Sequence, residues 1–134
     1  MRVLFDSNIL IDYLRGIPQA QGTLARHPNA AISLLNWIEV MVGVREPAHV
    51  APTRSFLARF EVIAPDARIA EMAVQMRQLR PRLRLPDALV WATARARGLT
   101  LMTRDAGDFP ADEDDVVAPY TLDRLHEPAA EYRA

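Results

Sequence analysis

The chain has 134 residues, half of them hydrophobic, and a formal net charge of −1. This length and composition predict one domain, residues 1–134, with a hydrophobic core of its own. The absence of cysteine excludes disulfides, a thiolate nucleophile and zinc–cysteine sites. The N-terminus lacks the apolar segment of a signal peptide, and no apolar run reaches the roughly 18 residues of a membrane span, so we expect a soluble, cytoplasmic protein.

The near-zero net charge combines two regions of opposite sign. Residues 68–104 contain eight arginines and two acids, a net of +6, whereas residues 105–134 contain nine acids and two arginines, a net of −7. Two interpretations of the arginines stay open. They form either a solvated, helix-favouring surface or a rim that contacts phosphates through the paired N–H groups of the guanidinium.

Short apolar segments alternate along the chain with segments of helical periodicity. We expect strands at residues 2–5, 30–33, 61–64, 99–102 and 116–118, and helices at residues 9–15, 18–27, 34–43, 47–60, 67–80 and 83–98. This alternation predicts an α/β fold in which a mainly parallel sheet lies between helical layers. The last residues, about 121–134, are expected to form a C-terminal extension that is partly loose.

The helix expected at residues 34–43 carries an apolar stripe formed by Leu35, Ile38 and Val42. Burial in the core and a role as a partner surface are both compatible with apolar residues on this helix. The run of four acids at residues 112–115 is expected to be a solvated turn.

Four acidic residues occupy equivalent places relative to the expected strands. Asp6 follows the first strand, Glu39 lies on the helix after the second, Asp87 opens a helix, and Asp105 follows the penultimate strand. Ligands of open α/β sheets bind at the carboxyl ends of the strands, so these acids are expected around one cleft. Several adjacent carboxylates need a counter-charge, which Mg²⁺ or Mn²⁺ supplies. Such an ion suits phosphodiester hydrolysis.

Each acid taken alone has a simpler explanation. Asp6 fits a turn, Glu39 fits an outward-pointing charge, and Asp87 is favoured in the first turn of a helix by the unpaired N–H groups there. Either Ser7 or Asn8 is expected to cap the helix that follows the first strand. The metal-site hypothesis therefore depends on the four acids together.

Four segments carry these acids in order: residues 3–12 (VLFDSNILID), 32–43 (ISLLNWIEVMVG), 85–94 (LPDALVWATA) and 101–109 (LMTRDAGDF). Together they resemble the motifs of PIN-domain proteins of the VapC toxin type, and the resemblance runs from residue 3 to about residue 120. It implies a PIN-like three-layer α/β/α domain. The implied activity is that of a divalent-metal-dependent endoribonuclease, the toxin of a type II toxin–antitoxin pair, which inhibits translation and growth.

The resemblance also implies roles for individual residues. Asp6, Glu39, Asp87 and Asp105 would be the catalytic metal ligands for Mg²⁺ or Mn²⁺. Family members vary between Asn and Asp at the position of Asp105 and often keep an acid at that of Asp108, so either residue could complete the set. Asp105 is favoured because it lies nearer the end of the strand.

Four further residues are expected to assist the acids. Asn8 and Thr103 would support the site through hydrogen bonds, and Arg84 and Arg104 would contact RNA or the antitoxin. The implied partners are an RNA substrate, with structured RNAs such as tRNA and rRNA among the candidates, a VapB-like antitoxin and a second copy of the chain in a homodimer. No membrane partner is expected.

Two other readings compete with the nuclease. A catalytically silent PIN-like scaffold would be indicated by an incomplete acidic set, whereas the set here is complete. A phosphatase of the haloacid-dehalogenase type would carry an Asp-x-Asp motif after the first strand and use a supporting lysine. This chain has Asn8 at that position and no lysine, which argues against such an enzyme.

Overall fold

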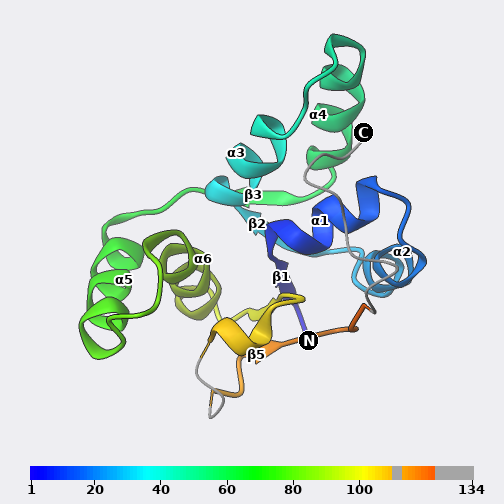
Figure 1. Ribbon diagram of the computed structural model, residues 1–134. Helices are drawn as coiled ribbons and strands as arrows, with labels where there is room; N and C mark the ends of the chain where they lie inside the picture. Colours follow the sequence, from blue (N-terminus) through cyan, green and yellow to red (C-terminus); the bar gives the residue numbers. More distant parts are fainter. Residues whose placement is uncertain (110–112, 123–134) are drawn as a thin grey trace.

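The computed structural model describes residues 1–109 and 113–122, which form a sheet of parallel strands between helices (Figure 1). The strands are β1 (Val3–Phe5), β2 (Ala31–Ser33), β3 (Glu61–Ile63), β4 (Thr100–Met102) and β5 (Val116–Val117). Their order is β3-β2-β1-β4-β5, and every neighbouring pair is parallel. The predicted parallel sheet is confirmed, and the central position of β1 places Asp6 in the middle of its carboxyl edge.

Helices cover both faces of this sheet. They are α1 (Ser7–Leu14), α2 (Pro18–Arg26), α3 (Leu34–Val42), α4 (Val50–Leu57), α5 (Ala67–Leu79) and α6 (Leu85–Ala96), with 3-10 turns η1 (Pro47–His49) and η2 (Ala106–Asp108). Figure 1 shows α5 and α6 on one side of the sheet and α1 and α2 on the other. The predicted three-layer α/β/α architecture is therefore confirmed.

The alternation of side chains along each strand divides the core into two halves. Leu4 and Leu101 face α5 and α6, where they belong to the same buried cluster as Trp91. Phe5 and Met102 face the opposite way and pack with residues of α1, α2 and α4. Because both faces are covered, the central strand β1 is apolar at every position, as is typical of strands in parallel sheets.

The apolar stripe of α3 is mostly exposed, which excludes burial of the whole stripe in the core. Ile38 is 46% exposed and Val42 is 77% exposed, whereas Asn36 and Val40 are completely buried. Leu35 alone of the predicted stripe packs against the core. The helix is rotated in this way because the Asn36 side chain is turned toward the start of α1, where it finds hydrogen-bond partners.

The predicted solvated turn at residues 112–115 is also corrected. Arg95 of α6 binds both Glu113 and Asp115, each at 2.8 Å, and Arg80 binds Glu113 at 2.7 Å. The indole N–H of Trp91 also donates to Asp115, at 3.1 Å. Two of the acids thus neutralise arginines from the positively charged region, while Asp112 lies outside the described residues.

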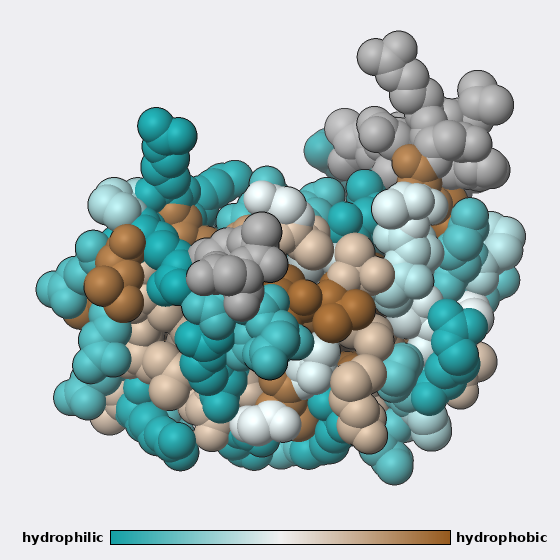
Figure 2. All heavy atoms as spheres, turned by 90° about the horizontal axis from the view of Figure 1, so that it is seen from below, coloured by the Kyte–Doolittle hydropathy of each residue, from teal (hydrophilic) through white to brown (hydrophobic). Residues whose placement is uncertain are grey.

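The face of the molecule seen from below is mostly hydrophilic, with hydrophobic side chains exposed in small groups between polar ones (Figure 2). Such scattered apolar exposure is normal for a folded domain. None of the helices in the two described ranges has the length and hydrophobicity needed to cross a membrane.

Candidate active site

A cleft of about 640 Å³ opens at the carboxyl edge of the sheet. Its lining residues come from four segments of the chain and are Asp6, Ser7, Asn8, Ile11, Glu39, Arg82, Arg84, Asp87, Asp105 and Asp108. The structure therefore brings together all five acids that the sequence singled out. Ser7 and Arg82 belong to the same cleft and were not expected there.

Asp6 is held at the junction between β1 and α1. Its backbone N–H donates to the carbonyl of Met102 at 2.9 Å, which continues the sheet pairing by one residue. Its Oδ1 accepts the backbone N–H of Ser7 at 2.8 Å and so caps α1. The prediction that Ser7 or Asn8 is the cap is wrong, because both residues are already inside the helix. Asp6 thus combines a capping role with a place in the cleft.

Asn36 supports Asp6 from α3. Its amide Nδ2 donates to Asp6 Oδ1 at 3.3 Å and to Ser7 Oγ at 3.0 Å, while its Oδ1 accepts the backbone N–H of Ser33 at 2.8 Å. Ser33 and Asn36 form the capping box that starts α3, which confirms Ser33 as the cap. The Ser-x-x-Asn spacing before an apolar helix was the available signal for Asn36, although such boxes more often use Glu or Gln.

Glu39 lies one turn after Asn36 on the same helix. The Ser7 hydroxyl donates to Glu39 Oε1 at 2.9 Å, which fixes the carboxylate toward the cleft. Glu39 is exposed overall, so its placement on an apolar helix does not bury a charge in the core. Nothing in the sequence around Ser7 signals this contact, because the two residues are separated by 32 positions.

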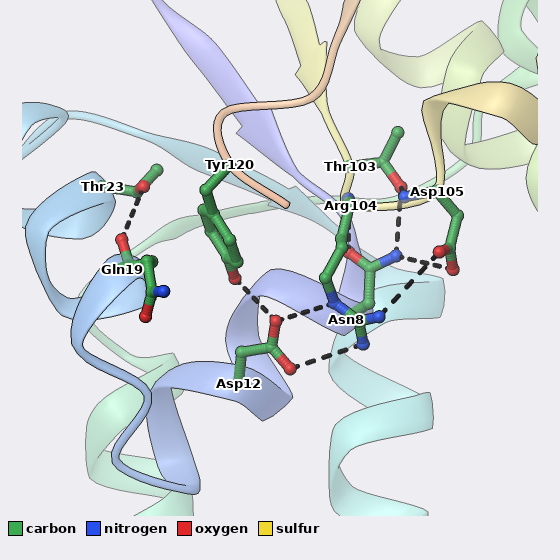
Figure 3. Close-up of polar contacts among 8 residues, drawn as sticks. All are labelled: Asn8, Asp12, Gln19, Thr23, Thr103, Arg104, Asp105 and Tyr120. Carbon is green, nitrogen blue, oxygen red and sulfur yellow. Dashed lines mark hydrogen bonds and ion pairs between the residues drawn. The ribbon is translucent and has the colours of Figure 1, made fainter. Parts of the chain in front are cut away.

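Asn8 and Thr103 join α1 to the loop that carries Asp105. The Asn8 amide Nδ2 donates to Thr103 Oγ1 at 3.1 Å and to Asp105 Oδ2 at 3.2 Å (Figure 3). In return, Asn8 Oδ1 accepts the backbone N–H of Arg104 at 3.1 Å, and Thr103 Oγ1 accepts that of Asp105 at 3.2 Å. These bonds give both residues the contacts that a supporting role requires.

The two arginines singled out by the sequence lie in different settings. Arg84 lines the cleft beside Arg82, and its charge opposes the upward shift in the pKa of Asp87. Arg104 does not line the cleft, because its guanidinium is directed to the buried carboxylate of Asp12 at 2.9 Å. Arg84 is therefore better placed than Arg104 to meet a ligand in the cleft.

Burial and mutual repulsion act on the acids of the cleft. Burial raises the pKa of Asp6 to about 6, the charges of Asp87 and Glu39 add to the shift, and hydrogen bonds including that from the Ser7 N–H partly offset it. Burial also raises the pKa of Asp87, and the neighbouring acids of the Asp105 loop contribute. The raised pKa values of Asp6 and Asp87 follow mainly from burial, and the negative charges of neighbouring acids add to them.

Oxygen-rich, anionic donors of this kind fit Mg²⁺ or Mn²⁺. Within residues 1–109 and 113–122, however, no three acidic or histidine side chains are close enough to form a ready-made metal cluster. Mg²⁺ retains several waters in typical protein sites and needs few direct protein ligands. The donor chemistry therefore fits such an ion, with the carboxylates spread around the cleft.

The raised pKa of Asp6 predicts a dependence of stability on pH in EDTA. The usual aspartate pKa is 3.8 and the folded value is about 6, so the unfolded state loses its proton first as pH rises. The Asp6 contribution to the free energy of unfolding falls by about 2–3 kcal/mol between pH 4 and pH 7. Asp6→Asn is therefore expected to be more stable than wild type at pH 7.5 and equal to it near pH 4. Urea denaturation at both pH values measures the difference, and a variant less stable at pH 7.5 would contradict the prediction.

A family model described as PIN domain matches residues 3–111 of the chain. The chain belongs to the PIN domain family. This PIN domain is 33% identical to Ribonuclease VapC10 of Mycobacterium tuberculosis over 118 residues, which cover 83% of this chain and 88% of that protein. The expected family membership is confirmed.

Solved structures agree with this assignment. A toxin–antitoxin complex from Klebsiella pneumoniae contains a chain that is 43% identical to this PIN domain, with a TM-score of 0.83 over 90% of this chain and 99% of that one. FitAcB from Neisseria gonorrhoeae superposes with a TM-score of 0.76 at 23% identity, covering 91% of this chain and 100% of that one. The second similarity shows a shared fold alone.

Proposed function

We propose that this PIN domain is a divalent-metal-dependent endoribonuclease that acts as the toxin of a toxin–antitoxin pair. The observation that carries the proposal is the convergence of Asp6, Glu39, Asp87, Asp105 and Asp108 on one cleft. The names of its relatives, a ribonuclease and a toxin–antitoxin complex, support the same reaction and role.

Asp6, Glu39, Asp87 and Asp105 would hold Mg²⁺ or Mn²⁺, with Asp108 at the same cleft as the alternative fourth ligand. The bound ion would supply an activated water and offset the charge that develops on the phosphate. The chain's own contribution is orientation, because the Ser7 hydroxyl fixes Glu39 and the Asn8 amide fixes Asp105. Holding ligands in place before substrate arrives reduces the reorganisation needed during the reaction.

The arginines at the cleft would bind the substrate. Arg82 and Arg84 are exposed and line the same space as the acids. A guanidinium binds a phosphate through two parallel N–H groups, so this pair would hold the phosphates that flank the scissile bond. Structured RNA, including tRNA and rRNA, is the proposed substrate class.

The proposed partners are a VapB-like antitoxin, which would neutralise the nuclease, and a second copy of the chain. The toxin–antitoxin complex from Klebsiella pneumoniae supports an antitoxin partner, because it contains a chain that is 43% identical to this one, whereas FitAcB is 23% identical. We further propose that residues 1–134 form one domain acting in the cytoplasm, with residues 123–134 of the expected extension outside the described part.

A cleavage assay tests the proposed reaction. Purified protein is incubated with a mixture of tRNA and rRNA fragments in Mg²⁺, Mn²⁺ or EDTA, beside Asp87→Asn. We expect cleavage with either metal, none in EDTA, and none by the variant. Cleavage that persists in EDTA would contradict the metal dependence. Failure to cleave in any condition, together with no binding of Mn²⁺ by calorimetry, would favour the scaffold reading instead.

A further inference from the structure

Asp12 is a completely buried carboxylate that lies outside the cleft. It is on α1, one turn after Asn8, so both side chains lie on the same face of the helix. A buried carboxylate is costly unless its partners satisfy it closely. Here Arg104 donates from Nε to Oδ2 at 2.9 Å and from Nη2 to Oδ1 at 3.4 Å, and the Tyr120 hydroxyl donates to Oδ2 at 2.7 Å (Figure 3).

Arg104 connects this buried group to the cleft. Its backbone N–H binds Asn8, and its chain neighbours are Thr103 and Asp105, which also bind Asn8. The side chain of Arg104 is only 20% exposed and is turned toward α1. The loop is therefore bound to α1 at two residues, Asn8, which lines the cleft, and Asp12, which does not.

Tyr120 brings a third segment to the same point. It follows β5, beyond the acidic loop in the chain, and its ring packs against the buried cluster that includes Phe5 and Ile9. Burial and the Asp12 charge raise the pKa of Tyr120, so its hydroxyl stays protonated and donates. Tyr120 comes after the Asp105 loop and β5 in the chain and is absent from the residues that line the cleft.

We propose that Tyr120 is a positioning residue, which acts through Asp12 and Arg104 to fix the loop that bears Thr103 and Asp105. The effect on catalysis rests on the proposed nuclease function, whereas the effect on the loop does not. The segment after β5 thereby becomes part of the active-site support. Loosening it changes how Asp105 is held without removing any residue of the cleft.

Hydrogen exchange of the full chain, measured by NMR, tests the loop directly. Tyr120→Phe removes only the hydroxyl, and we expect the backbone amides of Arg104 and Asp105 to exchange about tenfold faster, which corresponds to 1.4 kcal/mol. Amides in α5 are expected to be unchanged. Arg104→Lys, which keeps the charge and loses the two-pronged contact, should give the same local change. Unchanged amides in both variants, or equal acceleration throughout the chain, would overturn the proposal.

Tyr13→Phe is the matched control, because Tyr13 packs against the same cluster and its hydroxyl accepts from Arg59 rather than bonding Asp12. It should leave both loop amides unchanged. In the cleavage assay, Tyr120→Phe should lower kcat about five- to tenfold with KM changed less than twofold, and raised KM with unchanged kcat would overturn the positioning role. A wild-type protein that does not cleave RNA, combined with the local change in exchange, would support the loop effect and overturn the proposed function alone.

Discussion

Asp6→Asn is expected to lower the rate of RNA cleavage by at least ~1000-fold, a loss of about 4 kcal/mol of transition-state stabilisation. Asparagine has the same shape and still accepts the Ser7 N–H that caps α1, so the fold should survive. What it removes is the negative charge at the centre of the cleft, next to Asp87 and Glu39. A neutral amide would be a much poorer ligand for Mg²⁺ or Mn²⁺.

Asp66→Asn is the matched control for this experiment. Asp66 caps α5 by accepting the Ile69 N–H at 2.8 Å, so it performs the same structural task as Asp6 away from the cleft. Single-turnover cleavage with saturating metal should be lost in Asp6→Asn and unchanged in Asp66→Asn. Similar rates for wild type and Asp6→Asn would show that the cleft is not where the reaction occurs.

Trp91→Ala is expected to reduce the free energy of unfolding by about 3–5 kcal/mol, the usual range for removing a large buried aromatic residue. Trp91 is completely buried, with Arg95 and Arg80 over its ring at 4.5 and 5.2 Å. Its ring also meets Phe109 edge-on at 5.8 Å, and its N–H binds Asp115. The substitution therefore leaves a cavity and also removes the contacts of Trp91 with Phe109 and Asp115.

Two further substitutions separate these contributions. Trp91→Phe keeps most of the volume and loses the hydrogen bond to Asp115, so we expect a loss of about 1–2 kcal/mol. Trp37→Ala is the control, since Trp37 is partly exposed on α3 beneath Arg54, and about 1–2 kcal/mol is expected. Urea denaturation followed by circular dichroism gives all three values. Equal losses for Trp37→Ala and Trp91→Ala would contradict the central place given to Trp91.

Features set by neighbouring residues could be predicted from the sequence. Helix α6 begins with Pro86 in its first turn and ends before Gly98, whose φ of +66° is the conformation that favours glycine after a helix. Gly16 ends α1 in the same way, with a φ of +80°. The main cleft acids could also be grouped, because Asp6 and Asp105 follow strands, and Asp87 and Glu39 lie on helices whose places in a parallel sheet are predictable.

Features that depend on distant contacts could not be predicted. Periodicity shows that α3 is amphipathic but not how it is rotated, and contacts to residues about 30 positions away turned Asn36 inward and Ile38 outward. The ion pairs of Glu113 and Asp115 likewise involve arginines far away in the chain. Composition alone indicated a solvated turn there, because it carries no information about which opposite charges meet.

Asn36 ties the start of a helix to the chemistry of the cleft, since one amide group serves Ser33, Ser7 and Asp6 at once. A replacement that still closes the capping box, such as Gln or Glu, would have to place a longer side chain in a fully buried space. A shorter side chain, such as that of Ser, would not reach Asp6 and Ser7. Position 36 therefore tolerates neither a longer nor a shorter side chain. Relatives in which Asn36 is replaced are expected to differ at Ser7 as well.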